Sequence, residues 1–247
     1  MFSKFLTSFG KYLLMLKAMF SRPENFKMYW KEFMSQCYEI GYGSLPIVLI
    51  ISVFLGAVTT VQTAYQLVSP LVPQTTIAQI VRESMLLELS PTVLSIVLAG
   101  VVGSKIASEL GNMRVSEQID ALEIMGINST SYLVFPKIAA SLLVIPLLVV
   151  ISAVVGIWGG RLAGDMSGII SYNIFDQGVQ QNFTPFSVTF ALIKSYTFAF
   201  LISSISAYFG YYVKGGALEI GRASTKSVVV SCITILLADY ILAALLL

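Results

Sequence analysis

Long apolar runs alternate with short polar segments along this chain. Five of these runs have about 20 residues or more, the length that a helix needs to cross a hydrocarbon layer of about 30 Å. A transmembrane β-barrel would show short segments of alternating polarity instead, and this sequence lacks them. The pattern predicts an all-α integral membrane protein whose five transmembrane helices form one domain, residues 44–247. The predicted spans are residues 44–68, 84–108, 138–160, 186–213 and 227–247.

Residues 1–43 carry a different pattern, that of helices lying in the membrane interface. At 100° per residue the apolar side chains of the first helix share one arc, and basic side chains lie opposite. We expect Pro23 to end this helix. A second, weaker amphipathic stretch follows over residues 26–37 and is predicted to end near Gly41 and Gly43; packing on protein and contact with lipid are equally compatible with it. The apolar arc of the first helix consists of Phe2, Phe5, Leu6, Phe9, Leu13, Leu16 and Phe20.

The composition excludes several classes of protein and several kinds of site. Of the 247 residues 56% are hydrophobic and 11% are charged, far from the balance of a soluble domain. The chain has no histidine, which excludes His-dependent triads, the usual zinc sites and haem ligation. We predict no catalytic residues, no metal site and no cofactor. A net charge of +2 gives no reason to expect nucleic acid, and Cys37 and Cys232 are not expected to form a disulfide.

The basic residues predict the orientation in the membrane. Twelve of the fifteen Lys and Arg residues lie before the first span, at the end of the second span or after it, or after the fourth. These three regions share one side of the membrane, which the positive-inside rule makes the cytoplasmic side. We therefore expect a cytoplasmic N-terminus and a C-terminus on the outer side, together with the polar loop 161–185, which has room for one short helix.

The segment from Glu109 to Asn128 is short and charged and lies between two apolar runs, so we expect it outside the hydrocarbon. It predicts one compact helix over residues 115–126, with Ser116 as the N-cap and Gly126 as the left-handed residue at the C-terminal end. On spacing alone a solvated cytoplasmic linker is the better fit. One side of the helix carries Val115, Ile119 and Leu122, and the other carries Glu117, Asp120 and Glu123.

Three ionisable residues lie inside predicted spans: Glu88, Lys194 and Asp239. A charge there costs a few kcal/mol or more unless it is paired or hydrated. With a rise of about 1.5 Å per residue, all three lie in the outer half of the membrane. We expect Lys194 to pair with Asp239, with Glu88 nearby. Such a group either locks the helices together or lies beside an outward-opening cavity, where it can meet a polar head group.

Residues 216–223 are the nearest match to a nucleotide-binding loop, and the match fails. The motif needs Lys where Arg222 stands and Ser or Thr where Ala223 stands, and it should follow a buried strand. The chain also has no nucleophile elbow. Energy for active transport must therefore come from another subunit or from an ion gradient. Glycines spaced for close helix packing lie at Gly100, Gly103, Gly156, Gly159 and Gly160.

The sequence ELGNMRVSEQIDAL, from Glu109 to Leu122, closely resembles the signature of the MlaE (YrbE) type of permease, the membrane subunit of ABC systems that move lipids. The similarity extends over nearly the whole chain from about Gly41, with further motifs in family order. These are Leu55-Gly56 with Gln62, Glu88-Leu89-x-Pro91, Ala99-Gly100-x-x-Gly103-Ser104, Val155 to Gly160 and Gly221 to Thr225.

This resemblance implies a homodimeric permease in the bacterial inner membrane. Two ABC ATPase subunits would dock on cytoplasmic coupling helices, and a ring of MCE-domain proteins would accept or deliver phospholipid on the periplasmic side. The coupling residues that it implies are Glu109, Arg114, Glu117, Gln118, Asp120 and Leu122.

The sequence departs from the family pattern at two positions. Relatives often have Arg where this chain has Leu87 and Val101, which puts in doubt a head-group contact beside Glu88, although Arg82 lies close enough in sequence to serve there. Three alternatives remain open: a permease for sterol or fatty acid, an ion-coupled transporter that uses Glu88 and Asp239, and a scaffold for MCE proteins.

Overall fold

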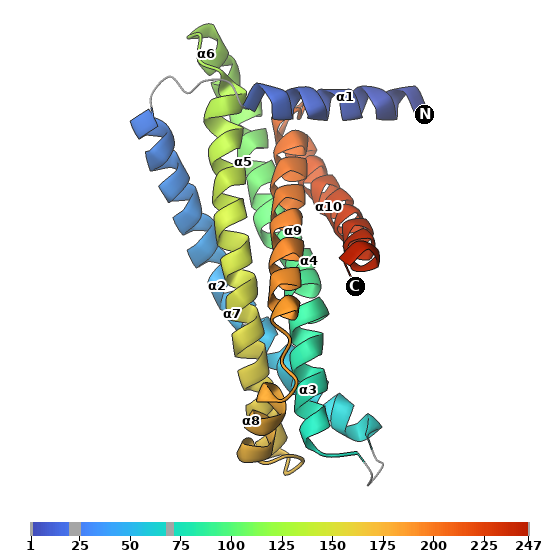
Figure 1. The fold of residues 1–247 in the computed structure, drawn as a ribbon. Coiled ribbons are helices and arrows are strands. Elements are labelled where there is room, and N and C mark those ends of the chain that lie inside the picture. Colours follow the sequence, from blue (N-terminus) through green and yellow to red (C-terminus); the bar gives the residue numbers. More distant parts are fainter. Residues whose placement is uncertain (1, 20–25, 68–71, 247) are drawn as a thin grey trace. The chain divides into compact units, whose positions relative to one another are not determined.

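The computed structural model describes residues 2–19, 26–67 and 72–246, and within them all regular structure is helical, which confirms the predicted class (Figure 1). Three segments are π-helical and carry the label η. In chain order the elements are α1 (Phe2–Met19), α2 (Phe26–Gln66), α3 (Thr75–Ser84), η1 (Met85–Val93), α4 (Leu94–Leu98), η2 (Ala99–Gly103), α5 (Ser104–Val115), α6 (Gln118–Ile124), η3 (Thr130–Val134), α7 (Phe135–Met166), α8 (Tyr172–Gln180), α9 (Pro185–Tyr211) and α10 (Ala217–Leu246).

Five helical segments of the described chain are long and apolar enough to cross a membrane, as predicted. The second combines α3, η1, α4, η2 and α5, and the third begins with η3. The predicted short helix in the loop after the third span is α8. The break predicted at Pro23 and the start of the turn that closes the first span, Ser69 to Leu71, lie outside the described residues. The five segments are Lys27–Gln66, Thr75–Val115, Thr130–Met166, Pro185–Tyr211 and Ala217–Leu246.

The predicted end of a helix near Gly41 and Gly43 is wrong, because α2 runs without a break from Phe26 to Gln66. A glycine inside a helix costs only about 1 kcal/mol relative to alanine. Packing outweighs that cost here, since Ile40 and Val48 are buried on either side of the two glycines. The interfacial stretch and the first span are therefore one continuous helix.

The chain forms two compact units. The first comprises Met1–Gly43, Ile96–Val144 and Phe198–Ala238. In it, α1 buries Met15 and Met19 and leaves its Leu6, Phe9 and Leu13 side chains exposed. The exposed residues belong to the predicted apolar arc, so this arc does not pack on the described protein. Phe2, Phe5 and Phe20 of the same arc lie outside the described side chains.

The second unit comprises Ser44–Ser95, Ile145–Thr197 and Asp239–Leu247, and α2 and α7 pack in it through glycines. A Cβ on Gly159 would lie 2.6 Å from the Val53 carbonyl oxygen, and one on Gly160 would lie 2.5 Å from Thr60 Oγ1. Gly156 and Gly56 also meet backbone to backbone. Close packing at these small residues is confirmed, as it is for Gly103 in the first unit; Gly100, by contrast, has open space around it, so its predicted packing role is wrong.

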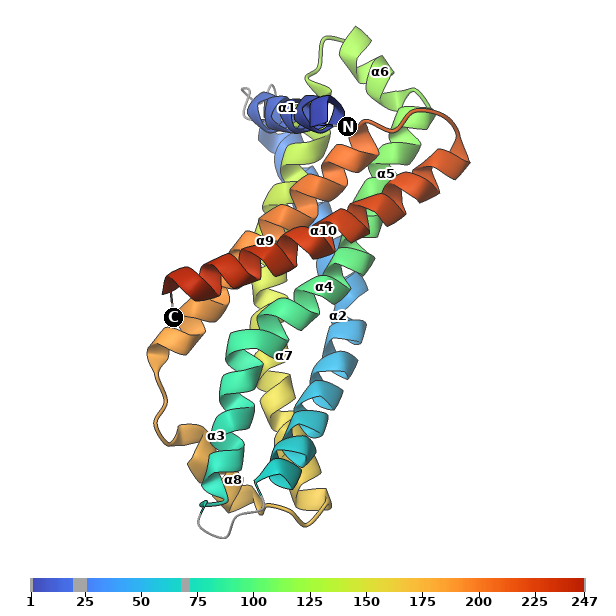
Figure 2. The same ribbon diagram turned by 90° about the vertical axis from the view of Figure 1, so that its right-hand side faces the viewer.

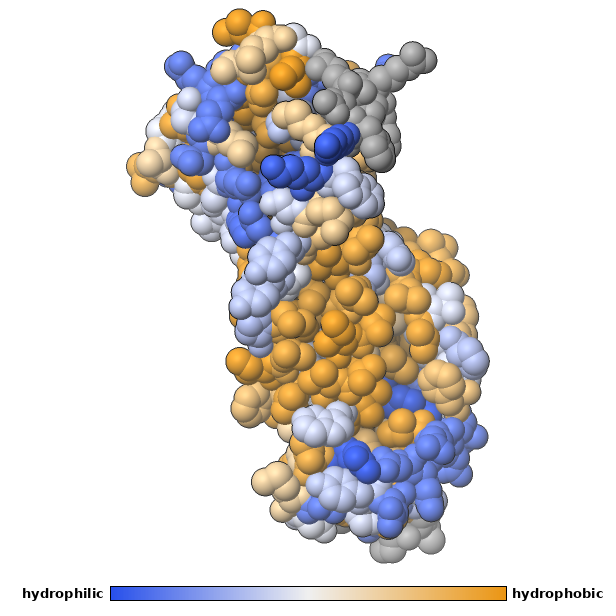
Figure 3. Space-filling view, turned by 90° about the vertical axis from the view of Figure 1, so that its left-hand side faces the viewer, coloured by the Kyte–Doolittle hydropathy of each residue, from blue (hydrophilic) through white to orange (hydrophobic). Residues whose placement is uncertain are grey.

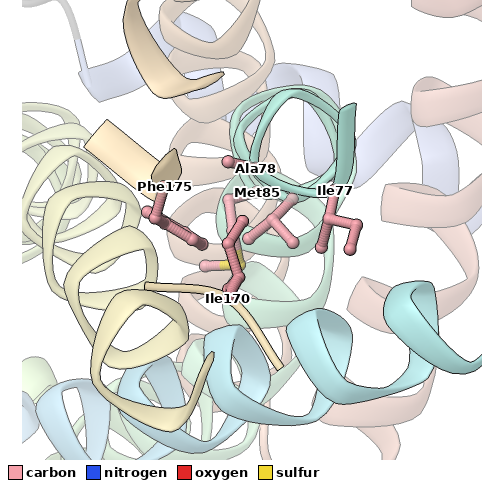
Figure 4. Close-up of a cluster of buried hydrophobic side chains, with 6 residues drawn as sticks. Ile77, Ala78, Met85, Ile170 and Phe175 are labelled. Atoms are coloured by element: carbon pink, nitrogen blue, oxygen red, sulfur yellow. The ribbon is translucent and has the colours of Figure 1, made fainter. Parts of the chain in front are cut away.

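The core of the second unit lies where α3 and the start of η1 meet α8. Figures 1 and 2 both show α8 beside α3, and Gly178 of α8 approaches the backbone of Thr75. Side chains from α3, η1, α8 and the turn before α8 fill this contact (Figure 4). Their burial fixes the end of α3 from which η1 continues. The cluster consists of Ile77, Ala78, Val81, Met85, Ile170 and Phe175.

One face of α2 in the second unit is apolar and exposed. Its large side chains recur about every four residues, the spacing of a single helix face. Figure 3 shows many apolar side chains gathered on the surface it views. A soluble protein rarely exposes a contiguous apolar surface of this kind, whereas a membrane protein presents one to lipid. The exposed residues are Ile50, Phe54, Val58, Val61 and Tyr65.

Candidate functional site

The charged segment folds into α6, which is held between two tight turns. At its start Glu117 is left-handed, with a φ of 59°. At its end Gly126 is left-handed, with a φ of 80°, as predicted. The Ile127 amide donates to the Leu122 carbonyl, 3.0 Å away, which satisfies one of the carbonyl groups left free at a helix end. The segment is therefore a separate short helix.

Ser116 does not cap this helix, which corrects one prediction. Its hydroxyl donates to the Asn112 carbonyl, 2.8 Å away in α5, and Ser116 is the residue that ends α5. The helix begins at Gln118 instead of the predicted residue 115. A serine hydroxyl can bond either forward to a free amide or back to a carbonyl, and the left-handed Glu117 takes the chain out of reach of the forward bond.

Two of the three side chains of the predicted acidic face, those of Asp120 and Glu123, are engaged within the protein. Asp120 Oδ1 accepts a hydrogen bond from Arg114 Nη1 at 2.8 Å. Glu123 Oε1 accepts from Ser129 Oγ at 2.9 Å and from the Tyr211 hydroxyl at 3.0 Å. Of the predicted acidic face, Asp120 is paired with a cation and Glu123 is hydrogen-bonded to two neutral hydroxyl groups.

The surface that α6 leaves open is more apolar than the sequence suggested. Ile124 is 87% exposed and Met125 is 65% exposed, at the end of the helix. Glu117 and Gln118 are exposed at its start. Ile119 is fully buried and anchors the helix from the other side. The open surface of α6 thus has apolar side chains at the end of the helix and polar ones at its start.

Glu109 and Leu122, two further predicted coupling residues, take part in contacts within the protein. The Glu109 carboxylate lies 2.7 Å from the ammonium group of Lys137, whose side chain is buried. This ion pair joins α5 to the start of α7. Leu122 is half-buried, and its carbonyl takes part in the turn that ends α6. Of the six predicted coupling residues, the structure thus places Glu117 and Gln118 on the open surface and uses the others wholly or partly in internal contacts.

The three intramembrane charges come together in the second unit. Lys194 Nζ lies 2.5 Å from Asp239 Oδ1 and 3.2 Å from Glu88 Oε1. The Lys194 side chain is completely buried, whereas those of Asp239 and Glu88 are 17% and 51% exposed. Thr92 Oγ1 lies 3.0 Å from Asp239 Oδ1 and 3.3 Å from Glu88 Oε2. With one ammonium and two carboxylates, the cluster has an excess of negative charge, and Glu88 is its most accessible member.

A backbone carbonyl completes the surroundings of Lys194. Lys194 Nζ donates to the Leu87 carbonyl at 2.8 Å. In an α-helix this carbonyl would accept from the residue four positions later, which is Pro91 and has no N–H. Pro91 lies in η1, a π-helical segment of the kind often found at functional sites. Pro91 therefore cannot compete for the Leu87 carbonyl, which accepts from the buried ammonium.

Arg82 does not take the place of an arginine beside Glu88, which corrects a second prediction. Its guanidinium donates to the carbonyls of Val179, Gln181 and Asn182 at 2.6 to 3.2 Å, and to Glu83. All five of its N–H groups are thereby used. Arg82 caps the C-terminal end of α8 and has no donor left for another ligand.

Comparison with known proteins shows to which family this chain belongs. The model of the family described as Permease MlaE matches residues 33–245. The chain belongs to the MlaE permease family. A "Probable ABC transporter permease protein" of Rickettsia bellii is 37% identical over 95% of this chain and 90% of its own length. A Synechocystis protein of the same description is 36% identical, over 85% of this chain and 79% of its own.

A plant relative is also similar to this MlaE permease. The chloroplastic protein TRIGALACTOSYLDIACYLGLYCEROL 1 of Arabidopsis thaliana is 35% identical over 88% of this chain and 62% of its own length. Both parts of the candidate site, α6 and the Lys194 cluster, lie within the residues that match the family.

Sequence reasoning missed several members of the site. From the sequence, Pro91 is recognised only as part of a motif, although a proline within a span deprives the carbonyl four residues earlier of its α-helical N–H donor. Thr92 follows it directly. Tyr211 and Ser129 carried no signal, because a tyrosine at the end of an apolar helix is common in membrane proteins. Their bonds to Glu123 appear only once the fold brings them together.

Proposed function

We propose that this chain is the permease subunit of an ABC-type lipid transporter in the bacterial inner membrane. It works as a homodimer and moves phospholipid between that membrane and a periplasmic MCE-protein carrier. The observation that carries the proposal is the membership of the MlaE permease family over residues 33–245, joined to an exposed helix between two spans. The name of the plant relative includes a glycerolipid, which supports a lipid as cargo.

The energy comes from a partner. Residues 217–223, which contain most of the near-match to a nucleotide-binding loop, are helical in α10. Arg222 and Ala223 stand where such a loop needs Lys and Ser or Thr, so the segment lacks the side chains that would bind the phosphates and their Mg²⁺. An ATPase subunit supplies hydrolysis, and α6 is its docking element. The distribution of basic residues supports a cytoplasmic position for α6, on the side where ATP is available.

The docking surface is small and mixed in character. Ile124 and Met125 supply apolar contacts, and Glu117 and Gln118 supply polar ones at the other end of the helix. Exposed apolar side chains at the centre of an interface, with polar groups at its edge, are typical of protein contacts. Movement of the ATPase subunits on binding and hydrolysing ATP would displace α6 and, through it, the spans.

The exposed face of α1 supports the interfacial part of the proposal. Leu6, Phe9 and Leu13 are exposed together, which suits a helix lying in the membrane surface with this face toward the acyl chains. Burial of Tyr12 raises the pKa of its phenol, so the group stays protonated and shares a hydrogen bond with Ser204 Oγ at 2.8 Å. This bond holds α1 to the end of α9.

The Lys194 cluster is proposed to contact the head group of the lipid. Glu88 is half exposed beside a buried ammonium, so it can accept hydrogen bonds from, or pair with, a cationic head group without leaving Lys194 unpaired. The test measures phospholipid transport in Lys194→Ala, Asp239→Ala and the double variant. Stable proteins with unimpaired transport would leave the cluster only a structural role.

Co-purification tests the proposed function as a whole. Wild-type permease extracted from its native membranes should retain an ATPase subunit, and Glu117→Arg with Asp120→Arg should lose it. Asp165→Arg, a similar charge change in the segment predicted on the opposite side, is the matched control and should retain it. Ion-driven transport by the chain alone, with no ATPase retained by the wild type, would support the secondary transporter instead.

A further inference from the structure

We propose that Tyr211 is a positioning residue that fastens α6 to the end of α9, so that a force applied to α6 reaches the transmembrane helices. The inference rests on the proposed function and adds to it the contact through which docking is transmitted. Tyr211 is the last residue of α9, and its side chain is buried. Its hydroxyl lies 3.0 Å from Glu123 Oε1 and 2.7 Å from Ser129 Oγ.

The turns on either side of α6 explain why such a fastening is needed. The chain enters α6 through Ser116 and the left-handed Glu117, and leaves it through the left-handed Gly126. Neither junction continues a helix, so neither resists rotation of α6 in the way that an unbroken helix does. A helix held only by two such turns would rotate about them under a force, and the force would not reach the transmembrane helices.

Both internal acid contacts of α6 converge on Tyr211. Glu123 accepts its hydroxyl directly. Asp120 binds Arg114, whose guanidinium carbon lies 5.9 Å from the centre of the Tyr211 ring. Hydrogen bonds to a carboxylate are stronger than those between neutral groups, and the cation above the ring adds an attraction to its face. Glu123 thus ties Tyr211 directly to α6, and Arg114 of α5, which binds Asp120, ties it to α6 indirectly.

The end of α9 also packs against α1 and α5. Tyr208, one turn before Tyr211, packs edge-on against Tyr12 of α1 with ring centres 5.9 Å apart. Gly210 lies against the backbone of Ala107 in α5, where a Cβ would come within 2.6 Å of the Ala107 carbonyl oxygen. A displacement of Tyr211 therefore reaches α1 and α5 through tight contacts that cannot absorb it.

The experiment uses the permease co-purified with its ATPase subunits and reconstituted in vesicles of phosphatidylethanolamine and phosphatidylglycerol. The readouts are the rates of ATP hydrolysis and of transport of a fluorescent phospholipid, and their ratio. For Tyr211→Phe we expect normal ATPase retention and hydrolysis, with the lipid moved per ATP reduced about tenfold, the effect of losing one hydrogen bond to a charged acceptor. Tyr212→Phe is the control, because its hydroxyl makes no hydrogen bond to a described residue, and it should behave as the wild type.

Variants of Glu123 provide the second arm. Glu123→Gln keeps an oxygen that accepts from Tyr211 and should retain most of the coupling, whereas Glu123→Ala should match Tyr211→Phe. The Glu123→Ala and Tyr211→Phe double variant should be no worse than either alone. An unchanged ratio in Tyr211→Phe, or loss of the ATPase subunit from it, would overturn the inference. Absence of ATP-dependent lipid transport in the wild type would instead contradict the proposed function.

Discussion

Lys194 lies with its ammonium nitrogen 2.5 Å from a carboxylate oxygen of Asp239, closer than the 3.2 Å that separates it from the Glu88 carboxylate. Lys194 is fully buried in the middle of α9. Burying a charge is tolerated only when the pair and its hydrogen bonds are complete. The Leu87 carbonyl and the Glu88 carboxylate complete the set around this ammonium.

Truncating one member of this pair should destabilise the protein more than truncating both. Lys194→Ala leaves two carboxylates without their cation, at a cost of about 3–5 kcal/mol. Lys194→Ala with Asp239→Ala removes the unpaired charge and should recover part of that loss. Thermal unfolding in detergent measures the effect for the two single variants and the double variant. Strictly additive losses would show that the two side chains do not interact.

Replacing Pro91 by alanine should loosen the same site through the backbone. The alanine supplies an N–H that can bond to the Leu87 carbonyl and so competes with Lys194 for this acceptor. We expect faster hydrogen exchange in η1 and lower phospholipid transport, with the protein still folded. Pro146→Ala, the same change inside α7, is the control. Unaltered exchange and transport in Pro91→Ala would show that the missing N–H is not required.

The contact between α2 and α7 should reject any side chain at Gly159. A Cβ there would lie 2.6 Å from the Val53 carbonyl oxygen, and a backbone group cannot move aside as a flexible side chain can. Gly159→Val should therefore abolish stable expression in the membrane. Gly100→Ala is the control, because nothing lies within 4 Å of that Cβ, and it should stabilise the helix by about 0.5–1 kcal/mol. Normal folding of Gly159→Val would contradict the described packing.

Removing the guanidinium of Arg82 should release the end of α8. Arg82→Ala leaves three carbonyls and the Glu83 carboxylate without their donor, and we expect a loss of about 2–4 kcal/mol. Hydrogen exchange should rise in α8 ahead of the rest of the protein. Arg222→Ala removes an exposed arginine paired three residues away and should change stability by less than about 0.5 kcal/mol. Equal effects of the two substitutions would refute the capping role.

The sequence was sufficient to predict the helical class and the five apolar spans, because hydrocarbon thickness sets their length and composition. It also predicted the approach of Lys194, Asp239 and Glu88, because three charges at one depth in an apolar medium have few other partners. Both results follow from the cost of leaving a polar group unpaired in a membrane.

Local signals failed where distant contacts decide the outcome. Gly41 and Gly43 predicted a helix end, but burial of side chains on both sides of them keeps α2 continuous. Ser116 was predicted to cap α6, but the backbone turn at Glu117 directs the Ser116 hydroxyl to α5. Arg82 was expected to serve beside Glu88, but the end of α8, which lies far along the chain, and Glu83 take all its donors. Each of these contacts depends on the folded arrangement.

The most direct measurement of the central claim is cross-linking from α6 in intact membranes. With Cys37 and Cys232 replaced by serine, Gln118→Cys places a single thiol on the exposed start of the helix. The account predicts a cross-link to an ATPase subunit and protection from a membrane-impermeant thiol reagent added on the periplasmic side. Labelling from the periplasm, with no cross-link to any ATPase, would contradict it.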